Sequence, residues 1–317
     1  MKECGIMNVT LSGGEAFVRK DLRELIDGLI KANVRFSILS NGTLIDDDIA
    51  KYLKSTGRCD HVQVSIDGAS PESHDAFRGE GVFVQAIEGL KMLMRNGIPA
   101  TVRVTLHKRN YKQLDKIAKL LLEEIGLPSF GTNAASYMGL CRENAQSVAL
   151  NALEYAEVMK TFVDLEKKYG KRISAQAGPQ ACLKHWREAE EAKEQGLEGL
   201  PGCGFLTSCG GVFNKIAVRA DGVMVPCDQI SHIELGRINK DSLREVWQTH
   251  PELIRLRQRR NIPLSEFEFC KGCEYIPYCR GGCPALSYTL MGDENQPSPD
   301  ACYRLFLEQG GRLPEEV

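Results

Sequence analysis

The chain has 317 residues, of which 43% are hydrophobic and 26% charged, an ordinary composition for a globular protein of one large or two medium domains. Its net charge of -2 argues against a nucleic-acid-binding protein that depends on a broad basic surface. No apolar run reaches membrane-spanning length, and the first ten residues lack a secretory signal. We therefore expect a cytoplasmic protein with neither a membrane nor a nucleic acid as partner.

Strand-like and helix-like segments alternate through the first half of the chain. Buried strands are predicted at residues 8–12, 34–39, 61–66, 100–106 and 129–133, with a further one at 171–175. The segments between them carry apolar residues at helical spacing and predict helices at residues 21–30, 46–55, 71–77, 83–96 and 111–125. This alternation indicates βαβ units and a parallel sheet that curls toward an open or closed barrel.

Three of these strands end in a turn of glycine and hydrogen-bonding residues. The turns are Gly13-Gly14-Glu15, Ser40-Asn41-Gly42 and Ser65-Ile66-Asp67-Gly68. One such turn would be explained as a well-capped strand-to-helix connection. Because ligands of α/β folds bind at the carboxyl ends of the strands, three successive turns favour a shared binding site.

The rest of the chain predicts a helical bridge and then a small domain. Residues 151–170 and 182–200 are predicted to be helical, residues 212–225 form a hairpin, and residues 241–249 form a helix. The arginine-rich stretch 255–260 is expected to be a solvated helix face. The predicted domains are residues 1–150, a bridge at 151–200, and a cysteine-rich domain at 201–310.

Eight of the twelve cysteines fall in the last third of the chain. They are Cys203, Cys209, Cys227, Cys270, Cys273, Cys279, Cys283 and Cys302. Four of them form a Cx2C-x5-Cx3C run, whose short loops turn the thiols toward a common centre. Eight thiolates make two sets of four, and four thiolates are what one iron–sulfur cluster takes. Disulfides, structural zinc and scattered buried cysteines are the alternatives.

The order of these cysteines resembles the SPASM domain of radical S-adenosylmethionine (SAM) enzymes. That pattern is a cysteine, then a glycine, four residues and a cysteine, followed by Cx2C-x5-Cx3C and a last cysteine. Here it is met by Cys209, Gly222 and Cys227, then the run, then Cys302. The resemblance implies two auxiliary [4Fe–4S] clusters. Their ligands would be Cys203, Cys209, Cys227 and Cys283 for the first, and Cys270, Cys273, Cys279 and Cys302 for the second.

Residues 6–140 resemble the radical SAM domain itself. Gly13, Gly14 and Glu15 match its GGE motif, which binds the methionyl amino group of SAM. Ser40 and Asn41 match positions that contact the ribose or the methionyl end, and Ser65 and Arg78 match positions used for the methionyl carboxylate. The resemblance implies an α/β fold: an incomplete (β/α)6 partial barrel that lacks its first strand, followed by a small cysteine-rich SPASM domain.

One part of the family pattern is absent from the sequence. Radical SAM enzymes carry CxxxCxxC some tens of residues before GGE, and only Cys4 precedes Gly13 here. We expect Met1 to be an internal start or a fragment boundary rather than the start of a degenerate relative. A third, SAM-binding [4Fe–4S] cluster is then expected only in a full-length form, and residues 1–317 are not expected to cleave SAM.

The resemblance implies an enzyme in its full-length form. SAM would be cleaved to a 5′-deoxyadenosyl radical that abstracts hydrogen from a peptide or protein side chain, with electrons from a small donor such as flavodoxin or ferredoxin. Asp228 matches an aspartate proposed as the base in sulfatase-maturing members. The alternatives are a tetrapyrrole substrate of the haem pathway, and a non-catalytic protein in which two clusters serve electron transfer or a scaffold.

Overall fold

The computed structural model describes residues 4–207 and 210–315, and the chain divides into two compact units. Unit 1 comprises residues 4–134 and 157–181 of this described part, and unit 2 comprises residues 135–156 and 182–315. Within the two described ranges, every helix is too short or too polar to cross a lipid bilayer.

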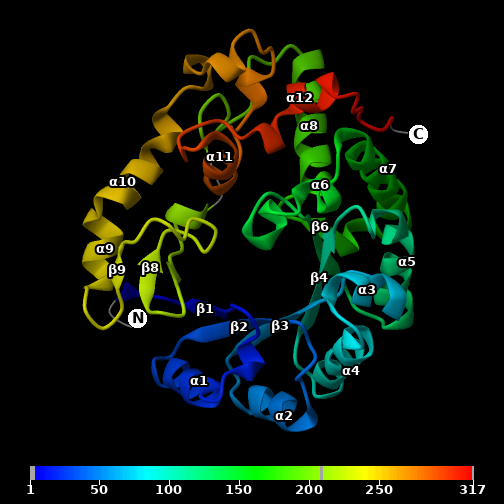
Figure 1. Cartoon of the computed structure of the whole chain (residues 1–317), viewed down its shortest axis with the longest axis vertical. Helices are drawn as coiled ribbons and strands as arrows, with labels where there is room; N and C mark the ends of the chain where they lie inside the picture. The colour runs from blue at the N-terminus through cyan, green and yellow to red at the C-terminus, as the bar shows by residue number, and fades with distance from the viewer. Residues whose placement is uncertain (1–3, 208–209, 316–317) are drawn as a thin grey trace. The chain divides into compact units, whose positions relative to one another are not determined.

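Unit 1 is built on one parallel sheet of six strands. Its strands are β1 (Asn8–Leu11), β2 (Arg35–Ser40), β3 (Cys59–Ser65), β4 (Ala100–Leu106), β5 (Phe130–Ala134) and β6 (Ile173–Ala175). They lie in sequence order across the sheet, and each neighbouring pair is parallel (Figure 1). Such an order arises when every crossover steps one strand in the same direction. The predicted α/β fold with an open parallel sheet is therefore confirmed.

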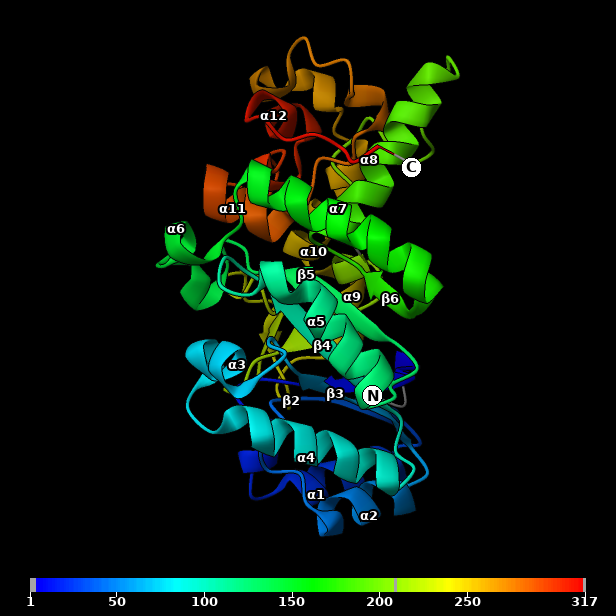
Figure 2. The same cartoon turned by 90° about the vertical axis from the view of Figure 1, so that its right-hand side faces the viewer.

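Helices connect the strands of unit 1. They are α1 (Leu22–Lys31), α2 (Asp47–Ser55), α3 (Pro71–Arg78), α4 (Val82–Arg95), α5 (Leu114–Lys119) and the C-terminal part of α7 (Ala152–Tyr169). Both views place α1, α2 and α4 along the same outer face of the strands (Figures 1 and 2). This is the arrangement expected of βαβ units, whose crossover helices cover a face of the sheet.

Strand β4 shows how the two faces of the sheet differ. Ala100, Val102, Val104 and Leu106 alternate along it and are buried. Arg103 points to the other face, where its Nε donates to Gln63 Oε1 at 3.3 Å and its Nη1 to the carbonyl of Thr132 at 3.2 Å. Because successive side chains point to opposite faces, one face packs in the core and the other stays polar.

Helix α4 packs very closely on the turn that follows β2. A Cβ built on Gly89 would lie 2.1 Å from the carbonyl oxygen of Gly42. Gly42 itself has a φ of +84°, and a Cβ there would lie 2.7 Å from Val64 Cγ1. Only glycine fits at both positions, so α4 holds the Ser40-Asn41-Gly42 turn against the end of the sheet.

The predicted helix 111–125 is not one regular helix. It consists of a 3-10 turn, η3 (Tyr111–Gln113), then α5, then a π turn, η4 (Leu120–Glu124). Leu121 and Leu122 are both buried, with 0% and 4% of their surface exposed. A π turn widens the helix by one residue, which lets these two adjacent leucines face the core together.

Unit 2 combines short strands with short helices. Its strands β7 (Ala217–Val218), β8 (Val223–Val225) and β9 (Gly236–Arg237) form a small antiparallel sheet, which contains the predicted hairpin. Its helices include α6 (Ala145–Val148), most of α8 (Pro179–Glu194), α9 (Leu243–Thr249), α10 (Pro251–Gln258), α11 (Pro284–Met291) and α12 (Tyr303–Glu308). Helix α10 overlaps the helix face predicted at residues 255–260. Helices α11 and α12 and strand β9 were not predicted, because they are short and their apolar spacing is irregular.

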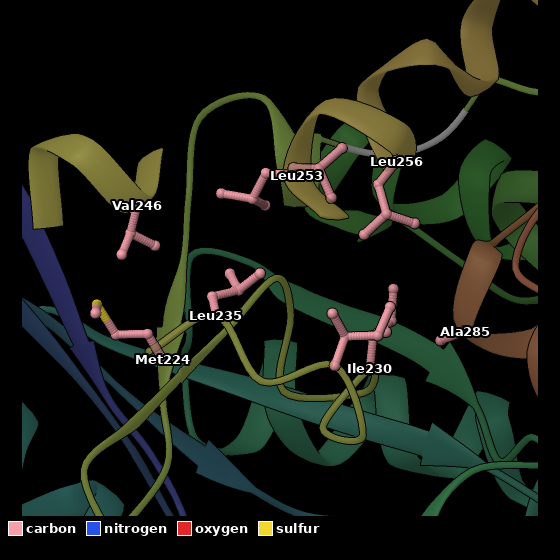
Figure 3. Packing of buried hydrophobic residues seen from close by; sticks show 9 residues of the cluster. Met224, Ile230, Leu235, Val246, Leu253, Leu256 and Ala285 are labelled. Carbon is pink, nitrogen blue, oxygen red and sulfur yellow. The ribbon is translucent and has the colours of Figure 1, made fainter. Parts of the chain in front are cut away.

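A hydrophobic cluster joins these elements. Leu253 and Leu256 of α10 lie opposite Met224, Ile230 and Leu235, with Val246 of α9 and Ala285 of α11 at the sides (Figure 3). The cluster is buried, and two cysteines, Cys227 and Cys283, pack at its edge.

The prediction of a solvated helix face at residues 255–260 is wrong for Leu256 and Arg259, which are both buried. Arg259 is only 1% exposed, whereas its neighbour Arg260 is exposed. Leu253, Leu256 and Arg259 follow one another at three-residue spacing, which places them on the same side of the helix. Arg259 is therefore a buried arginine. The sequence gives no sign of its burial, because several of its neighbours in sequence are also charged.

Candidate functional site

The carboxylate of Glu15 joins the first two of the predicted polar turns. Glu15 follows β1 and caps the 3-10 turn η2 (Ala16–Val18), where its Oε1 accepts from the amide of Phe17 at 3.2 Å. The same oxygen accepts from Ser40 Oγ at 2.8 Å, and Oε2 accepts from the amide of Asn41 at 2.7 Å. A carboxylate has about four acceptor positions, so three are used and one remains.

Glycine is needed on the approach to Glu15. Gly13 has a φ of +141°, a region that side-chain-bearing residues rarely adopt. Gly13 and Gly14 are both exposed, and no heavy atom lies within 4 Å of a Cβ built at either position. The backbone beside the Glu15 carboxylate is therefore open to a ligand.

The turn after β2 presents donors. Asn41 Oδ1 accepts from both the amide and the hydroxyl of Thr43, at 2.9 and 2.8 Å. Ser40 Oγ accepts from the amide of Gly42 at 2.9 Å while it donates to Glu15. These bonds fix the orientation of the Asn41 side-chain amide and of the Ser40 hydroxyl.

Asp67 organises the third turn, which the sequence analysis placed in the site without giving Asp67 a role. The Asp67 side chain is completely buried, and its Oδ2 accepts from Arg78 Nε at 2.6 Å. Its Oδ1 accepts from the amide of Thr105 at 2.7 Å, so it links β3, β4 and α3. Ser65 ends β3 two residues earlier, beside Arg103 of β4. Asp67 therefore holds the Arg78 side chain in place. The sequence feature that could have revealed this role is an aspartate directly after a predicted strand.

Two histidines lie against this aspartate and were also missed as part of the site. His74 Nδ1 accepts from the amide of Asp67 at 3.1 Å, and Asn110 donates to the Asp67 carbonyl at 2.8 Å. His107 stacks on Phe77 with ring centroids 4.1 Å apart. Burial lowers the pKa of His107 to about 4, and Asp67 opposes that shift.

In unit 2, four of the predicted cysteines line one cavity of about 120 Å³. They are Cys270, Cys273, Cys279 and Cys302, the set that the resemblance assigns to one cluster. Three short elements position them: Cys270 ends the 3-10 turn η10 (Glu268–Cys270), Cys279 follows η11 (Ile276–Tyr278), and Cys302 caps α12. The walls include the aromatic side chains of Trp186, Tyr275 and Tyr303.

The thiols of this cavity are buried and close enough to influence one another. Burial, reinforced by the other thiols, raises the pKa of Cys270 to about 12. Burial likewise raises the pKa of Cys279, to about 11, and that of Cys302. Two backbone amides donate to sulfur: Gly281 to Cys279 Sγ at 3.4 Å and Leu305 to Cys302 Sγ at 3.5 Å. Four sulfur donors with amide support match the ligands of an iron–sulfur cluster.

Two adjacent glycines bring the end of the cysteine run into place. Gly281 has a φ of +71°, and a Cβ there would lie 2.7 Å from Leu206 Cδ2. Gly282 has a φ of +83°, and its Cβ would lie 2.7 Å from that of Ser298. A side chain at either position would clash with Leu206 or Ser298 and would displace the segment that carries Cys279 and Cys283.

The other four predicted cysteine ligands are only partly described. Cys209 lies outside the described residues. Cys203 is buried and interacts electrostatically with Cys279, while Cys227 and Cys283 pack against the cluster of Figure 3. Within residues 4–207 and 210–315, no three His, Cys, Asp or Glu side chains meet closely enough to hold a single metal ion.

Asp228 lies beside this second set. The Cys227 thiol donates to Asp228 Oδ1 at 3.2 Å, and Gln229 Nε2 donates to its Oδ2 at 2.9 Å. Asp228 is exposed, beside the partly buried Cys227.

Two family models match the sequence, one in each half. The model of the Radical SAM superfamily matches residues 1–121, and that of the SPASM iron-sulfur cluster-binding domain matches residues 209–274.

Known relatives align over nearly the whole chain. An AdoMet-dependent heme synthase of Methanosarcina barkeri is 28% identical, over 93% of this chain and 82% of its own. An Fe-coproporphyrin III synthase of the same organism is 30% identical, over 95% of this chain and 77% of its own. A PqqA peptide cyclase of Ruegeria pomeroyi is 22% identical, over 93% and 74%.

Solved structures share the fold. Native anSMEcpe with bound AdoMet and the Cp18Cys peptide superimposes with a TM-score of 0.67 at 20% identity, covering 96% of this chain and 84% of that one. Streptococcus suis SuiB superimposes with a TM-score of 0.69 at 15% identity, covering 95% and 68%.

The buried histidines predict a pH-dependent stability of the folded chain. Because the pKa of His107 is lowered to about 4, the unfolded chain binds the extra proton below pH 6.5 and the folded chain does not. Stability is therefore complete above pH 6.5 and falls toward pH 4. In the parent chain, the free energy of unfolding should decrease between pH 7 and pH 5. His107→Asn, which keeps an acceptor near the Nδ1 position, should make this decrease smaller by roughly 2 kcal/mol.

The measurement is chemical denaturation of both chains at each pH. His74, whose pKa burial also lowers, leaves part of the slope in the variant. An identical decrease in the free energy of unfolding for the two chains would show that His107 does not titrate as described.

Proposed function

This chain belongs to the radical SAM superfamily and carries a SPASM iron–sulfur domain, and we propose that its full-length form is an oxidoreductase or maturase that uses SAM to abstract hydrogen from a peptide or protein side chain. The observation that carries this proposal is the convergence of Glu15, Ser40 and Asn41 at neighbouring strand ends. When bound and reductively cleaved, SAM supplies the radical that removes the hydrogen atom.

The residues at the strand ends fit SAM. The unused acceptor position of Glu15, next to the open backbone of Gly13 and Gly14, would accept from the methionyl ammonium group. Arg78, with its Nε fixed by Asp67, would donate from the outer edge of its guanidinium to the methionyl carboxylate, with Ser65 nearby. Ser40 and Asn41 would orient the ribose or the methionyl end.

The cysteines fit two auxiliary clusters. Cys270, Cys273, Cys279 and Cys302 would hold one cluster, supported by the cavity that they share. Cys203, Cys209, Cys227 and Cys283 would hold the other. Bound clusters would supply one-electron transfer or a site for the substrate. Asp228, exposed beside Cys227, would accept a proton from a substrate at that cluster.

The cluster that cleaves SAM does not fit residues 1–317, because the chain contains no CxxxCxxC. Residues 1–317 are therefore expected to bind SAM and the auxiliary clusters without cleaving SAM. A form that also carries CxxxCxxC would take its electrons from a small donor such as flavodoxin or ferredoxin.

Removing one cavity cysteine should remove one cluster. After anaerobic reconstitution, Cys273→Ala should contain about four fewer iron atoms per chain than the parent, because a four-iron cluster needs four thiolates. Cys59→Ala, whose thiol lies in β3 of unit 1, should keep the parental iron content. Equal iron in both variants, or zinc in place of iron in the parent, would contradict the assignment.

Replacing the Glu15 carboxylate should weaken SAM binding. Glu15→Gln loses the charge that faces the methionyl ammonium group, and a charge-assisted hydrogen bond lost in this way corresponds to at least tenfold weaker binding. The matched control is Glu24→Gln, which changes an exposed residue in the first turn of α1. Isothermal titration with SAM measures both, and equal affinities in the two variants would argue against the site.

A tetrapyrrole substrate is the second candidate, and the identities of 28% and 30% to heme and Fe-coproporphyrin III synthases favour it. The peptide candidate is supported by the PqqA peptide cyclase relative. Titration of the chain with iron coproporphyrin III separates the two by absorbance. A peptide-modifying enzyme should leave the Soret band unshifted, and a saturable shift would establish the second candidate.

A further inference from the structure

The buried arginine of unit 2 is the feature that the proposed function leaves unexplained. Helix α10 continues directly into the 3-10 turn η8 (Arg259–Asn261). Leu253 and Leu256 are fully buried on the inner side of this helix, and Arg259 follows at the same spacing. The guanidinium group is therefore carried into the protein interior by the same helix face that forms the hydrophobic cluster of Figure 3.

No residue in the described part of the chain pairs with this guanidinium. Its Nε, Nη1 and Nη2 are all buried and have no hydrogen-bond partner within residues 4–207 and 210–315. Burial lowers the pKa of Arg259 to about 10, which still leaves the group charged at neutral pH. A buried cation without partners is strongly unfavourable, so a native protein is expected to place an anion beside it.

The other arginines of the same helix are engaged. Arg255 forms ion pairs with Glu252 at 2.8 Å and Glu294 at 3.1 Å. Arg257 donates to the carbonyls of Val212 and Trp247 at 2.9 and 2.7 Å. Arg259 differs from them because acidic groups lie near its guanidinium but none accepts a hydrogen bond from it.

Three side chains act electrostatically on Arg259 in the direction that favours its charged form, namely Cys283, Asp293 and Glu294. Glu294 is already shared between Arg255 and His232, whose Nε2 lies 2.5 Å from Glu294 Oε1. Cys283 packs against the hydrophobic cluster to which Leu253 and Leu256 belong. An anionic group attached at Cys283 would therefore meet Arg259.

We propose that Arg259 is the buried counter-ion of the iron–sulfur cluster that Cys283 ligates, and that it raises the reduction potential of this cluster. The inference rests on the proposed function, because it takes Cys283 as a ligand. A cluster held by four thiolates carries net negative charge, and net charge and hydrogen bonds to sulfur set its potential. When a low-potential donor adds one electron, no bond forms or breaks, and a fixed cation in a low-dielectric site stabilises the reduced form.

The test compares three variants of the reconstituted 317-residue chain. Arg259→Met removes the charge and keeps an unbranched side chain, and Arg259→Lys keeps the charge. Arg260→Met removes the same charge from the exposed neighbouring position. Redox titration followed by electron paramagnetic resonance measures each cluster potential, together with iron content and melting temperature.

The expected result is selective. In Arg259→Met, one cluster should bind its electron at least tenfold less favourably, which is about 59 mV lower for a one-electron couple. The other cluster should be unchanged, Arg260→Met should match the parent, and Arg259→Lys should lie nearer the parent than Arg259→Met. If Arg259→Met fails to retain one cluster, retention in Arg259→Lys supports the same role.

Several results would overturn the inference. They are unchanged potentials in Arg259→Met with full iron content, an equal shift in Arg260→Met, or equal defects in the Met and Lys variants of Arg259. The last would show that packing, not charge, is what Arg259 provides. A parent chain without an iron–sulfur spectrum would instead refute the proposed function, so the two failures are distinguishable.

Discussion

Four thiol groups that face one small cavity are the constraint on which unit 2 depends. Burial and mutual repulsion raise the pKa values of Cys270, Cys279 and Cys302, so these groups favour the protonated state unless a cation shares the cavity. Metal binding and deprotonation are coupled at such sites. The surrounding chain is mostly 3-10 turns, and its path depends on Gly281 and Gly282, where no side chain fits. Short turns and these two glycines, more than long helices or strands, give this part of the chain its shape.

Two acidic residues at strand ends have different tasks in unit 1, and exposure separates them. Glu15 is partly exposed and keeps an acceptor position after its three hydrogen bonds, so it is able to bind a ligand. Asp67 is fully buried, and its carboxylate is used by Arg78 and the amide of Thr105. It therefore acts as a support that holds the Arg78 guanidinium in place. Both groups lie at the carboxyl ends of the strands, where an α/β sheet collects residues that are distant in sequence.

The arginines of helix α10 and of the following turn η8 show that a charged residue in the sequence can be exposed, paired or buried in the structure. Arg255 pairs with carboxylates, Arg257 lies over the Trp247 ring with its Cζ 4.3 Å from the centroid, and Arg259 is buried. Arg257 is two residues from each of the other two, so the helix turns it to a different side, whereas Arg259 lies about one turn beyond Arg255. The hydrophobic cluster of Figure 3 contains Leu253 and Leu256, and the buried Arg259 follows them at three-residue spacing. Of the three arginines, Arg259 is the one whose buried positive charge needs a negative charge nearby.

The sequence by itself determined the parallel α/β sheet, most of its helices, the three polar turns and the clustering of the cysteines, because these follow from local periodicity and spacing. It could not determine α11 and α12, the π turn that buries Leu121 and Leu122, or the role of Asp67, since short irregular segments carry weak periodic signals. Only the tertiary structure brought Glu15 to Ser40 and Asn41, gathered four cysteines around one cavity, and buried Arg259. The physical reason is that burial and pairing arise from contacts between residues far apart in the chain, which spacing along the sequence does not encode.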